Sequence, residues 1–204
     1  MARRRVNHLL IGGGLAAANC ARWLREEGGE GSILLVGREP NPPYNRPPLS
    51  KGYLQGKESR EDVLFRPAEW WDEQRIELLT RTSVMKLDSA ERVATLSTKE
   101  EVEFDTALLA TGANVKRLRT EGCDLDGIHY LRAFKNSDEI SAEAADAEHV
   151  VLVGGSYIAC EVAASLTAKG KRCTCVMLEE IAMSRSFGDE AGRFFHDVLS
   201  SHGV

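Results

Sequence analysis

A glycine-rich turn that occurs twice at a fixed spacing is the feature that most restricts the fold of this chain. The first copy lies in residues 6–24, VNHLLIGGGLAAANCARWL, and the second in residues 150–170, VVLVGGSYIACEVAASLTAKG. Gly12 matches Gly154, an offset of 142 residues that the other matched positions keep. Each copy reads as a short buried strand, a tight turn and a helix that starts with small residues, which is typical of a dinucleotide-binding βαβ unit. The repeat therefore favours two dinucleotide sites.

The charge balance narrows the class of partner. Twenty-six Lys and Arg face 31 Asp and Glu, and the formal net charge of −5 argues against nucleic acid as a main partner. The basic run Arg3–Arg5 is expected to be a solvated leader. Three glycines interrupt the first apolar run and charges follow it, which disfavours a secretory signal. No stretch approaches the ~18 apolar residues of a spanning helix, so we expect no membrane span.

The cysteines indicate the compartment. There are five, Cys20, Cys123, Cys160, Cys173 and Cys175, an odd number with no C-x-x-C pair. Without histidine or cysteine partners nearby, we expect no metal site. Free thiols of this kind fit a reducing cytoplasm.

The first copy carries the pattern Gly12-x-Gly14-x-x-Ala17. The first glycine permits a tight turn, the second lets backbone N–H groups approach a pyrophosphate, and the small third residue lets helix and sheet pack closely. The helix N-terminus offers N–H groups and a partial positive charge to phosphates. The alternative is a glycine turn without a ligand. After a strand at 33–36, Glu39 stands where an acid would bond a ribose hydroxyl, and Arg38 is a competing candidate that would favour a phosphate.

A proline-rich loop follows at residues 40–51, PNPPYNRPPLSK. Its five prolines forbid a regular helix and stiffen the backbone. A stiff loop that carries Arg46 and Lys51 would hold two cations in place for a pyrophosphate and the edge of an isoalloxazine ring. The alternative is a rigid surface loop with solvated charges.

At this loop a family resemblance becomes specific. GGGLAAA, followed by VGREPNPPYNRPPLSKGYL, resembles the FAD-dependent ferredoxin and rubredoxin reductase group of the pyridine nucleotide-disulphide oxidoreductases, to which apoptosis-inducing factor is more distantly related. The resemblance covers nearly all of this chain, but it corresponds to only about the first half of a family member. It implies FAD contacts at Gly12, Gly14, Leu15, Ala16, Glu39, Arg46, Lys51, Val84, Ala110, Thr111, Gly112 and Arg132. No cysteine occurs between Cys20 and Cys123, which argues against disulfide chemistry.

The second copy has Ser156 where the first has Gly14. The serine adds a Cβ near the phosphates and a hydroxyl that could bond them, and we expect it to be tolerated with altered affinity. The resemblance implies NAD contacts at Gly154, Gly155, Ser156, Tyr157, Ile158, Glu161 and Glu179.

The sequence predicts specific roles for two acids of the second copy, Glu161 and Glu179. The resemblance puts Glu161 at the junction of nicotinamide and flavin, where Lys51 and Glu161 would be the catalytic residues. The alternative for Glu161 is an acid in the first helical turn that favours the helix dipole. Glu179 follows the second strand, and an acid there favours NADH over NADPH. Arg185 would partly reverse this preference if it turned inward.

We therefore predict an α/β fold of two Rossmann-like, three-layer dinucleotide units with an inserted small antiparallel sheet, the second unit being incomplete. Residues 1–114 would form the FAD domain with an antiparallel flap at about 76–104, residues 115–147 a linker and an acidic helix, and residues 148–204 a truncated NAD(P) domain.

The predicted function is hydride transfer from NADH to FAD and then single-electron transfer to a ferredoxin or rubredoxin. The alternatives are another two-dinucleotide flavoprotein reductase, of the nitrite reductase or NADH:quinone type, and a truncated FAD-binding fragment without turnover. The acceptor within the class and the oligomeric state stay open.

Overall fold

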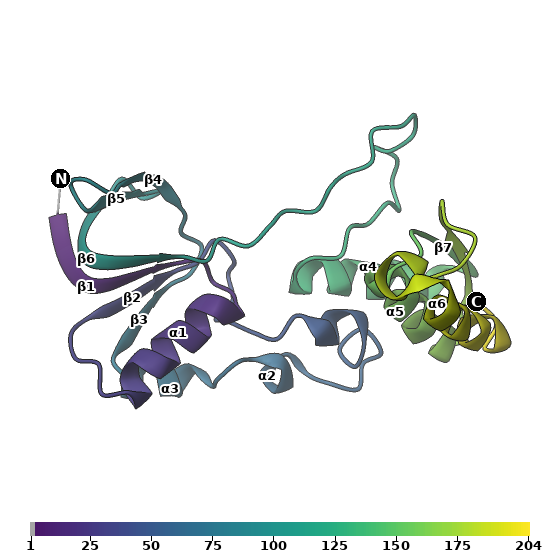
Figure 1. Ribbon diagram of the computed structural model, residues 1–204, viewed down its shortest axis with the longest axis horizontal. Coiled ribbons are helices and arrows are strands. Elements are labelled where there is room, and N and C mark those ends of the chain that lie inside the picture. The colour runs from purple at the N-terminus through teal and green to yellow at the C-terminus, as the bar shows by residue number, and fades with distance from the viewer. Residues whose placement is uncertain (1–2) are drawn as a thin grey trace. The chain divides into compact units, whose positions relative to one another are not determined.

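The structure is a computed structural model that describes residues 3–204. The chain divides into two compact units, which Figure 1 colours by residue number. The first contains the N-terminal segment up to Asn45 together with Leu64–Ala113, and the second contains Arg46–Val63 together with Asn114–Val204. The expected boundaries at 114 and 147 followed the order of the chain, whereas these units are discontinuous in sequence.

One six-stranded mixed sheet forms the first unit, with strand order β3-β2-β1-β6-β5-β4. Its strands are β1 (Arg3–Ile11), β2 (Ile33–Val36), β3 (Ile76–Leu79), β4 (Val84–Asp88), β5 (Val93–Leu96) and β6 (Glu101–Leu109). The first three strands and β6 are parallel neighbours, and the β4–β5–β6 part is antiparallel. The α/β class is confirmed.

The limits of the predicted flap are corrected by this sheet. Residues 76–79 belong to the parallel part, because Ile76 pairs with Ile33 of β2. The last strand of the expected flap does not end at 104 but continues to Leu109 as part of β6. A four-residue apolar stretch does not reveal the direction of its neighbour, and here the buried side chain of Ile76 joins the helix-covered core of the sheet.

Alternating residues of β1 and β2 feed two separate cores. Leu10, Ile33 and Leu35 face α1 (Leu15–Glu26) and α3 (Ala68–Glu73), which contribute Ala17, Ala21 and Trp71. Leu9, Leu34 and Val36 face the other way and pack with the hairpin β4–β5 and with β6. Figure 1 shows α1 below the sheet and this hairpin above it. Strands buried on both faces read as continuous apolar runs, as β2 and the last three residues of β1 do here.

The basic run at the N-terminus is part of this sheet and not a separate leader, although the side chains of Arg3 and Arg5 are exposed as expected. All three lie in β1. Their guanidinium groups pair with acids of the sheet and of the turn before β6, within 2.6 to 3.0 Å for the pairs Arg3–Glu103, Arg4–Glu77, Arg4–Glu100 and Arg5–Asp105.

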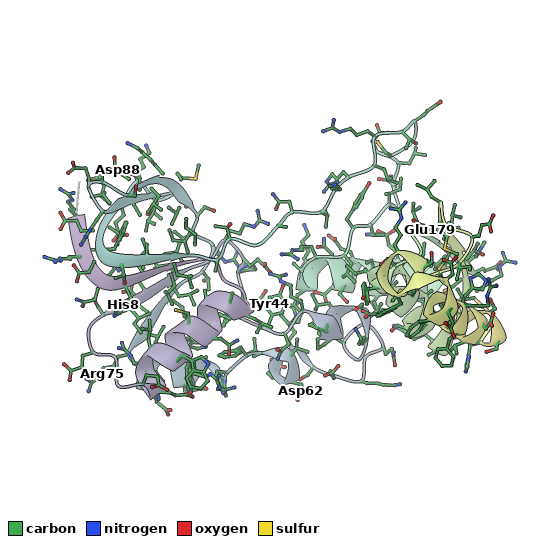
Figure 2. The ribbon with its side chains drawn as sticks, in the orientation of Figure 1. His8, Tyr44, Asp62, Arg75, Asp88 and Glu179 are labelled. Carbon is green, nitrogen blue, oxygen red and sulfur yellow. The ribbon has the colours of Figure 1, made fainter. Side chains whose placement is uncertain are left out.

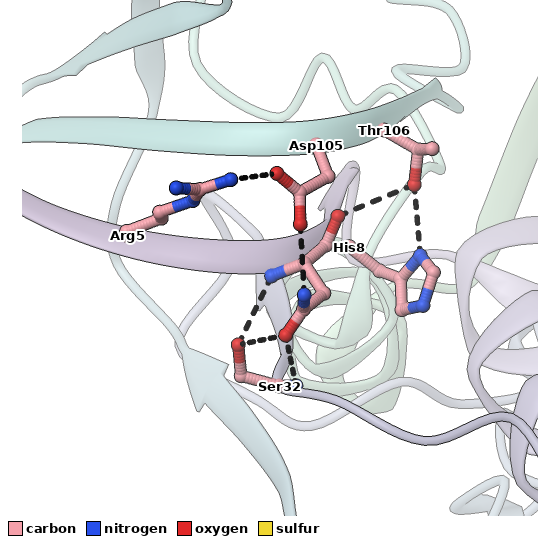
Figure 3. A network of polar contacts seen from close by, with 6 residues as sticks. Arg5, His8, Ser32, Asp105 and Thr106 are labelled. Carbon is pink, nitrogen blue, oxygen red and sulfur yellow. Dashed lines mark hydrogen bonds and ion pairs between the residues drawn. The ribbon is translucent and has the colours of Figure 1, made fainter.

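Polar side chains also join β1 to both of its neighbours (Figure 3). The amide of Asn7 donates to Asp105 of β6 at 2.8 Å and its carbonyl oxygen accepts the backbone N–H of Ser32 at 2.9 Å. The hydrogen bond from Arg5, supported by the one from Asn7, lowers the pKa of Asp105. This network ties the middle of β1 to the middle of β6 and to the residue before β2.

The second unit is built around one βαβ repeat. Its elements are the 3₁₀ helix η1 (Pro47–Ser50), α2 (Arg60–Val63), α4 (Phe134–Asp146), β7 (His149–Val153), α5 (Tyr157–Ala168), β8 (Arg172–Val176) and α6 (Ser184–Ser201). The strands β7 and β8 are parallel, with Val150 paired to Cys173. The acidic helix expected within residues 115–147 is present as α4. A kink at Gly188, where φ is +77°, interrupts α6.

Residues 46–63 belong to this unit because their side chains pack on its helices. Leu54, only 1% exposed, lies in one core with Ala144 of α4 and Leu166 of α5. The ring of Tyr53 meets that of Phe134 edge to face at 5.0 Å, and its hydroxyl donates to Asp138 at 2.6 Å. The loop that carries the predicted FAD cations is thus anchored on α4 and α5. Among residues 3–204 no helix is long and apolar enough to cross a membrane.

Candidate nucleotide-binding sites

The first glycine turn packs backbone against backbone on the end of β6. Gly12 has φ +132°, and a Cβ there would lie 2.0 Å from the carbonyl oxygen of Ala110. The N–H of Ala110 in turn donates to the carbonyl of Ile11 at 2.8 Å. Only glycine satisfies both the conformation and the space. Two of the predicted cofactor residues, Gly12 and Ala110, are therefore in contact.

The helix that follows this turn begins with its N–H groups open to a ligand. Gly14 is the N-cap of α1, and a Cβ built on it meets nothing within 4 Å. No side chain caps the helix, and no acid lies in its first turn, which Leu15 and Ala16 open. Uncapped first-turn N–H groups beside open space fit a pyrophosphate. The small residue required at the third position, Ala17, is fully buried.

Glu39 is held by a residue that sequence reasoning missed. The hydroxyl of Tyr44, a side chain only 2% exposed, donates to Glu39 Oε2 at 2.5 Å. A carboxylate can accept about four hydrogen bonds, so the bond from Tyr44 leaves acceptor positions on Glu39 for a ligand. The side chain of Glu39 is partly exposed and that of Arg38 is exposed. Tyr44 was visible in the proline-rich loop, but no pattern linked it to an acid five residues earlier.

A second missed feature is the close approach of Gly13 and Gly37. A Cβ on Gly37 would lie 2.9 Å from the Cα of Gly13, so the turn after β1 and the end of β2 meet through two glycines. Both glycines are visible in the sequence, but neither belongs to the spaced fingerprint.

The other predicted FAD residues of the first unit lie on and beyond the antiparallel strands. Val84 opens β4 and is half-buried against the core that the hairpin covers. Thr111 and Gly112 follow β6 and are exposed, and Gly112 has φ +66°.

In the second unit a cavity of about 280 Å³ gathers the predicted catalytic pair and two predicted FAD cations. It is lined by Arg46, Lys51, Arg132, Glu161 and neighbouring residues of η1 and α5. Lys51 Nζ lies 2.6 Å from Glu161 Oε2. Arg46 Nη1 donates to the backbone carbonyl of Arg132 at 2.5 Å. The side chains of Lys51 and Glu161 are 48% and 29% exposed, so both can meet a ligand.

Ser50 is a further part of this cavity that sequence reasoning missed. Its hydroxyl donates to Glu161 Oε2 at 2.6 Å, the oxygen that also meets Lys51. Its backbone carbonyl accepts the hydroxyl of Ser165 at 2.7 Å, and Gln55 donates to that hydroxyl at 3.0 Å. Ser50 is 4% exposed and Ser165 is 2% exposed. This buried hydroxyl chain ties the loop to α5 beside the Lys51–Glu161 pair.

Glu161 is the fifth residue of α5, which begins at Tyr157 and has no acid in its first turn. The influence of the helix dipole falls off within the first turn. The alternative reading of Glu161 as a first-turn acid is therefore wrong.

The second glycine turn borders a larger cavity of about 650 Å³. Its lining includes six of the predicted NAD contacts: Gly154, Gly155, Ser156, Tyr157, Ile158 and Glu179. Gly154 has φ +131° and donates to the carbonyl of Val176 at 2.8 Å, which repeats the geometry of Gly12. Ser156 is the N-cap of α5, is exposed, and its side chain makes no capping bond. The first-turn N–H groups thus fit a second pyrophosphate.

The rim of the larger cavity carries an ion pair. Glu179, labelled in Figure 2, pairs through Oε1 with Nε of Arg185. Both residues line the cavity, and the side chain of Glu179 is 22% exposed while that of Arg185 is 74% exposed. Arg185, which would partly reverse the preference for NADH, is thus in direct contact with Glu179.

Two thiols of the second unit, Cys160 and Cys175, are protonated near neutral pH. Burial raises the pKa of Cys175 to about 11 and also raises that of Cys160. Among residues 3–204 all five cysteines are free, and no cluster of three His, Cys, Asp or Glu is arranged to hold a metal ion.

Comparison with known proteins places this geometry in a family. The family described as pyridine nucleotide-disulphide oxidoreductase matches residues 6–204. A ferredoxin–NAD(P)(+) reductase from Sphingomonas sp is 34% identical over 196 residues, which cover 96% of this chain and 47% of that protein. The crystal structure of the ferredoxin reductase for the CYP199A2 system from Rhodopseudomonas palustris has a TM-score of 0.93 at 33% identity, over 97% of this chain and 49% of that one.

A covalent complex of putidaredoxin reductase with putidaredoxin matches with a TM-score of 0.89 at 28% identity, over 98% of this chain and 48% of that one. The chain spans about half the length of the curated relatives it matches. From its glycine turns, its fold and the match over residues 6–204, the chain belongs to the pyridine nucleotide-disulphide oxidoreductase family and has ferredoxin and rubredoxin reductases among its homologues.

Proposed function

We propose that this chain binds FAD at the first glycine turn and a nicotinamide dinucleotide at the second, as part of an NADH-dependent ferredoxin or rubredoxin reductase. The observation that carries the proposal is the repeated geometry. In both units a positive-φ glycine precedes a helix whose first-turn N–H groups have no side-chain cap, and an acid follows the next strand. Family membership supports the same pair of cofactors.

The residues of the first unit would hold FAD through its ends and its phosphates. The open N-terminus of α1 at Gly14 would take the pyrophosphate, and Glu39, steadied by Tyr44, would accept hydroxyls of the adenosine ribose. The backbone at Val84, Thr111 and Gly112 remains the predicted contact surface for the rest of the cofactor.

The residues of the second unit would hold NADH. The N–H groups behind Ser156 would take its pyrophosphate, and Glu179 at the cavity rim would accept hydroxyls of its adenosine ribose. An acid at that position supports NADH over NADPH.

Lys51 and Glu161 remain the proposed catalytic pair. When bound, the two cofactors would supply hydride transfer from NADH to FAD and single-electron transfer to an iron–sulfur protein. Glu161 and Ser50 would hold the Lys51 ammonium in one place, so that a fixed positive charge stands beside the reacting rings. No general acid or base is needed. Arg46 and Arg132, which line the same cavity, keep their predicted role as flavin contacts.

The proposed partner is a ferredoxin or rubredoxin. Support comes from the homologues, one of which has been crystallised in covalent complex with putidaredoxin. The five free thiols support a cytoplasmic site of action. Because the chain spans about half of its relatives, electron transfer to the partner is proposed for the whole protein, and nucleotide binding is the part to test on these residues.

Flavin binding can be tested with substitutions at one open position. A Cβ on Gly14 has room, so Gly14→Ala should fold and keep FAD affinity within about threefold. Gly14→Asp should lose affinity by tenfold or more, because a carboxylate at the helix N-terminus would repel the pyrophosphate. Affinity is measured by titrating FAD into the purified chain and following flavin fluorescence. A chain that leaves the flavin fluorescence of added FAD unchanged, and stays colourless after unbound FAD is removed, would contradict the proposal.

A further inference from the structure

The strongest unassigned feature is the ion pair on the rim of the larger cavity. Glu179 follows β8, and Arg185 lies in the first turn of α6. Both side chains line the cavity, together with the hydroxyl-bearing Ser184. A carboxylate alone at this place would accept ribose hydroxyls and repel a 2′-phosphate. Here a guanidinium is bonded to the carboxylate, so the rim carries both charges.

The backbone that carries Arg185 is fixed. The N–H of Met183 donates to the carbonyl of Gly155 at 2.6 Å, which fastens the start of α6 to the glycine turn. Met183 is buried and has φ +65°, and a Cβ on Gly192 of α6 would lie 2.9 Å from the carbonyl oxygen of Ala182. The position of the Arg185 Cα relative to the cavity is therefore set by the fold.

The side chain of Arg185, in contrast, can change its partner. It is 74% exposed, and exposed ion pairs hold weakly because water and side-chain entropy compete with them. A phosphate can be a stronger partner for arginine, since the planar guanidinium can bond two phosphate oxygens at once, whereas its contact with Glu179 runs from Nε to one oxygen. Glu179 is the less exposed of the two and would stay in place.

We propose that Arg185 is a specificity-determining residue that masks Glu179 and turns to a 2′-phosphate when one is present. This inference rests on the proposed nicotinamide dinucleotide site. It gives the chain the ability to use NADPH as well as NADH. We expect the ratio of NADH affinity to NADPH affinity, which Glu179 alone would make large, to be about tenfold or less. A tenfold ratio corresponds to ~1.4 kcal/mol of differential binding.

The test is calorimetric binding of NAD⁺ and NADP⁺ to the 204-residue chain and three variants. Arg185→Gln should weaken NADP⁺ at least about tenfold and change NAD⁺ by less than about threefold, as expected for one charge-assisted phosphate contact. Glu179→Gln should tighten NADP⁺ several-fold. Arg193→Gln removes the same charge from an exposed position of α6 that does not line the cavity, and it should change neither affinity.

The outcomes separate the inference from the proposed function. If NAD⁺ binds but Arg185→Gln leaves the NADP⁺ to NAD⁺ ratio unchanged, the role of Arg185 is refuted and the site stands. An equal loss of NADP⁺ affinity in Arg193→Gln would assign the effect to net charge and refute the inference. If neither nucleotide binds to the native chain or to any variant, the proposed second site fails and the inference fails with it.

Discussion

Replacing Ser50 with alanine isolates the hydroxyl that holds the carboxylate of Glu161. The substitution removes a 2.6 Å hydrogen bond to an ionised group while Lys51 still contacts the same oxygen. Bonds to charged groups contribute about 1.5–3 kcal/mol. Because the Glu161 side chain is 29% exposed, water can replace part of the bond, and we expect the lower end, about 1.5 kcal/mol.

The assay has to report on the second unit alone. All three tryptophans, Trp23, Trp70 and Trp71, lie in the first unit, so their fluorescence does not follow the second. Native-state amide exchange of α5 measures the opening free energy of the unit that contains Ser50 and Glu161. A loss of about 1.5 kcal/mol accelerates this exchange roughly tenfold.

A double-mutant cycle with Glu161→Ala provides the control. Ser50→Ala and Glu161→Ala should show a coupling of about 1–2 kcal/mol, since the two side chains bond directly. Ser137 is a matched buried serine whose hydroxyl donates to the carbonyl of Leu49 at 2.8 Å and does not bond Glu161. Ser137→Ala should destabilise the same loop yet be additive with Glu161→Ala. Additive behaviour of the Ser50 cycle would refute the view that Ser50 positions the carboxylate.

Three further predictions follow from single contacts. Tyr44→Phe should weaken FAD binding by about three- to tenfold in a fluorescence titration, because phenylalanine lacks the hydroxyl that donates to Glu39; equal affinities would contradict this. Asp105 has a pKa below its usual value, so it stabilises the fold above the ordinary Asp pKa of about 4, and this contribution disappears as the pH falls through the lower folded value. Asp105→Asn should therefore reduce stability at pH 6, and the reduction should shrink as the pH falls below about 4, as measured by urea unfolding followed by tryptophan fluorescence. Cys175, with a pKa of about 11, should react with a thiol-selective disulfide reagent at pH 8 at least tenfold more slowly than a free cysteine, and comparable rates would contradict the effect of burial.

Sequence reasoning succeeded where one local pattern determines one local structure. Gly12 and Gly154 both adopt the positive φ that the fingerprint requires, and each precedes a helix with an open N-terminus. Lys51 and Glu161, paired only through the family resemblance, are in contact although 110 residues separate them. The two glycine positions could be predicted because their backbone conformation requires glycine, so the residue type itself indicates the structure.

The misses concern partners that are distant in sequence. The parallel direction of β3 depends on its neighbour β2, which lies about 40 residues earlier in the sequence. The ion pairs of Arg3–Arg5 depend on acids of β3, of β6 and of the turn before β6, which also lie far away in the sequence. Tyr44 and Ser50 acquire roles only when the loop folds back on an acid. A serine or tyrosine in a loop has many possible partners, and sequence spacing does not select among them.

The assignment of residues 46–63 to the second unit has a consequence for synthesis on the ribosome. Leu54 emerges more than a hundred residues before its partners Ala163 and Leu166. At translation rates of about 5–20 residues per second, this apolar segment waits roughly 5–20 s before its packing surface exists. The first unit also has to fold from two separate segments, because the chain leaves it after Asn45 and rejoins it at Leu64. A nascent chain of this kind keeps the apolar side chain of Leu54 without its packing surface until α5 has been made.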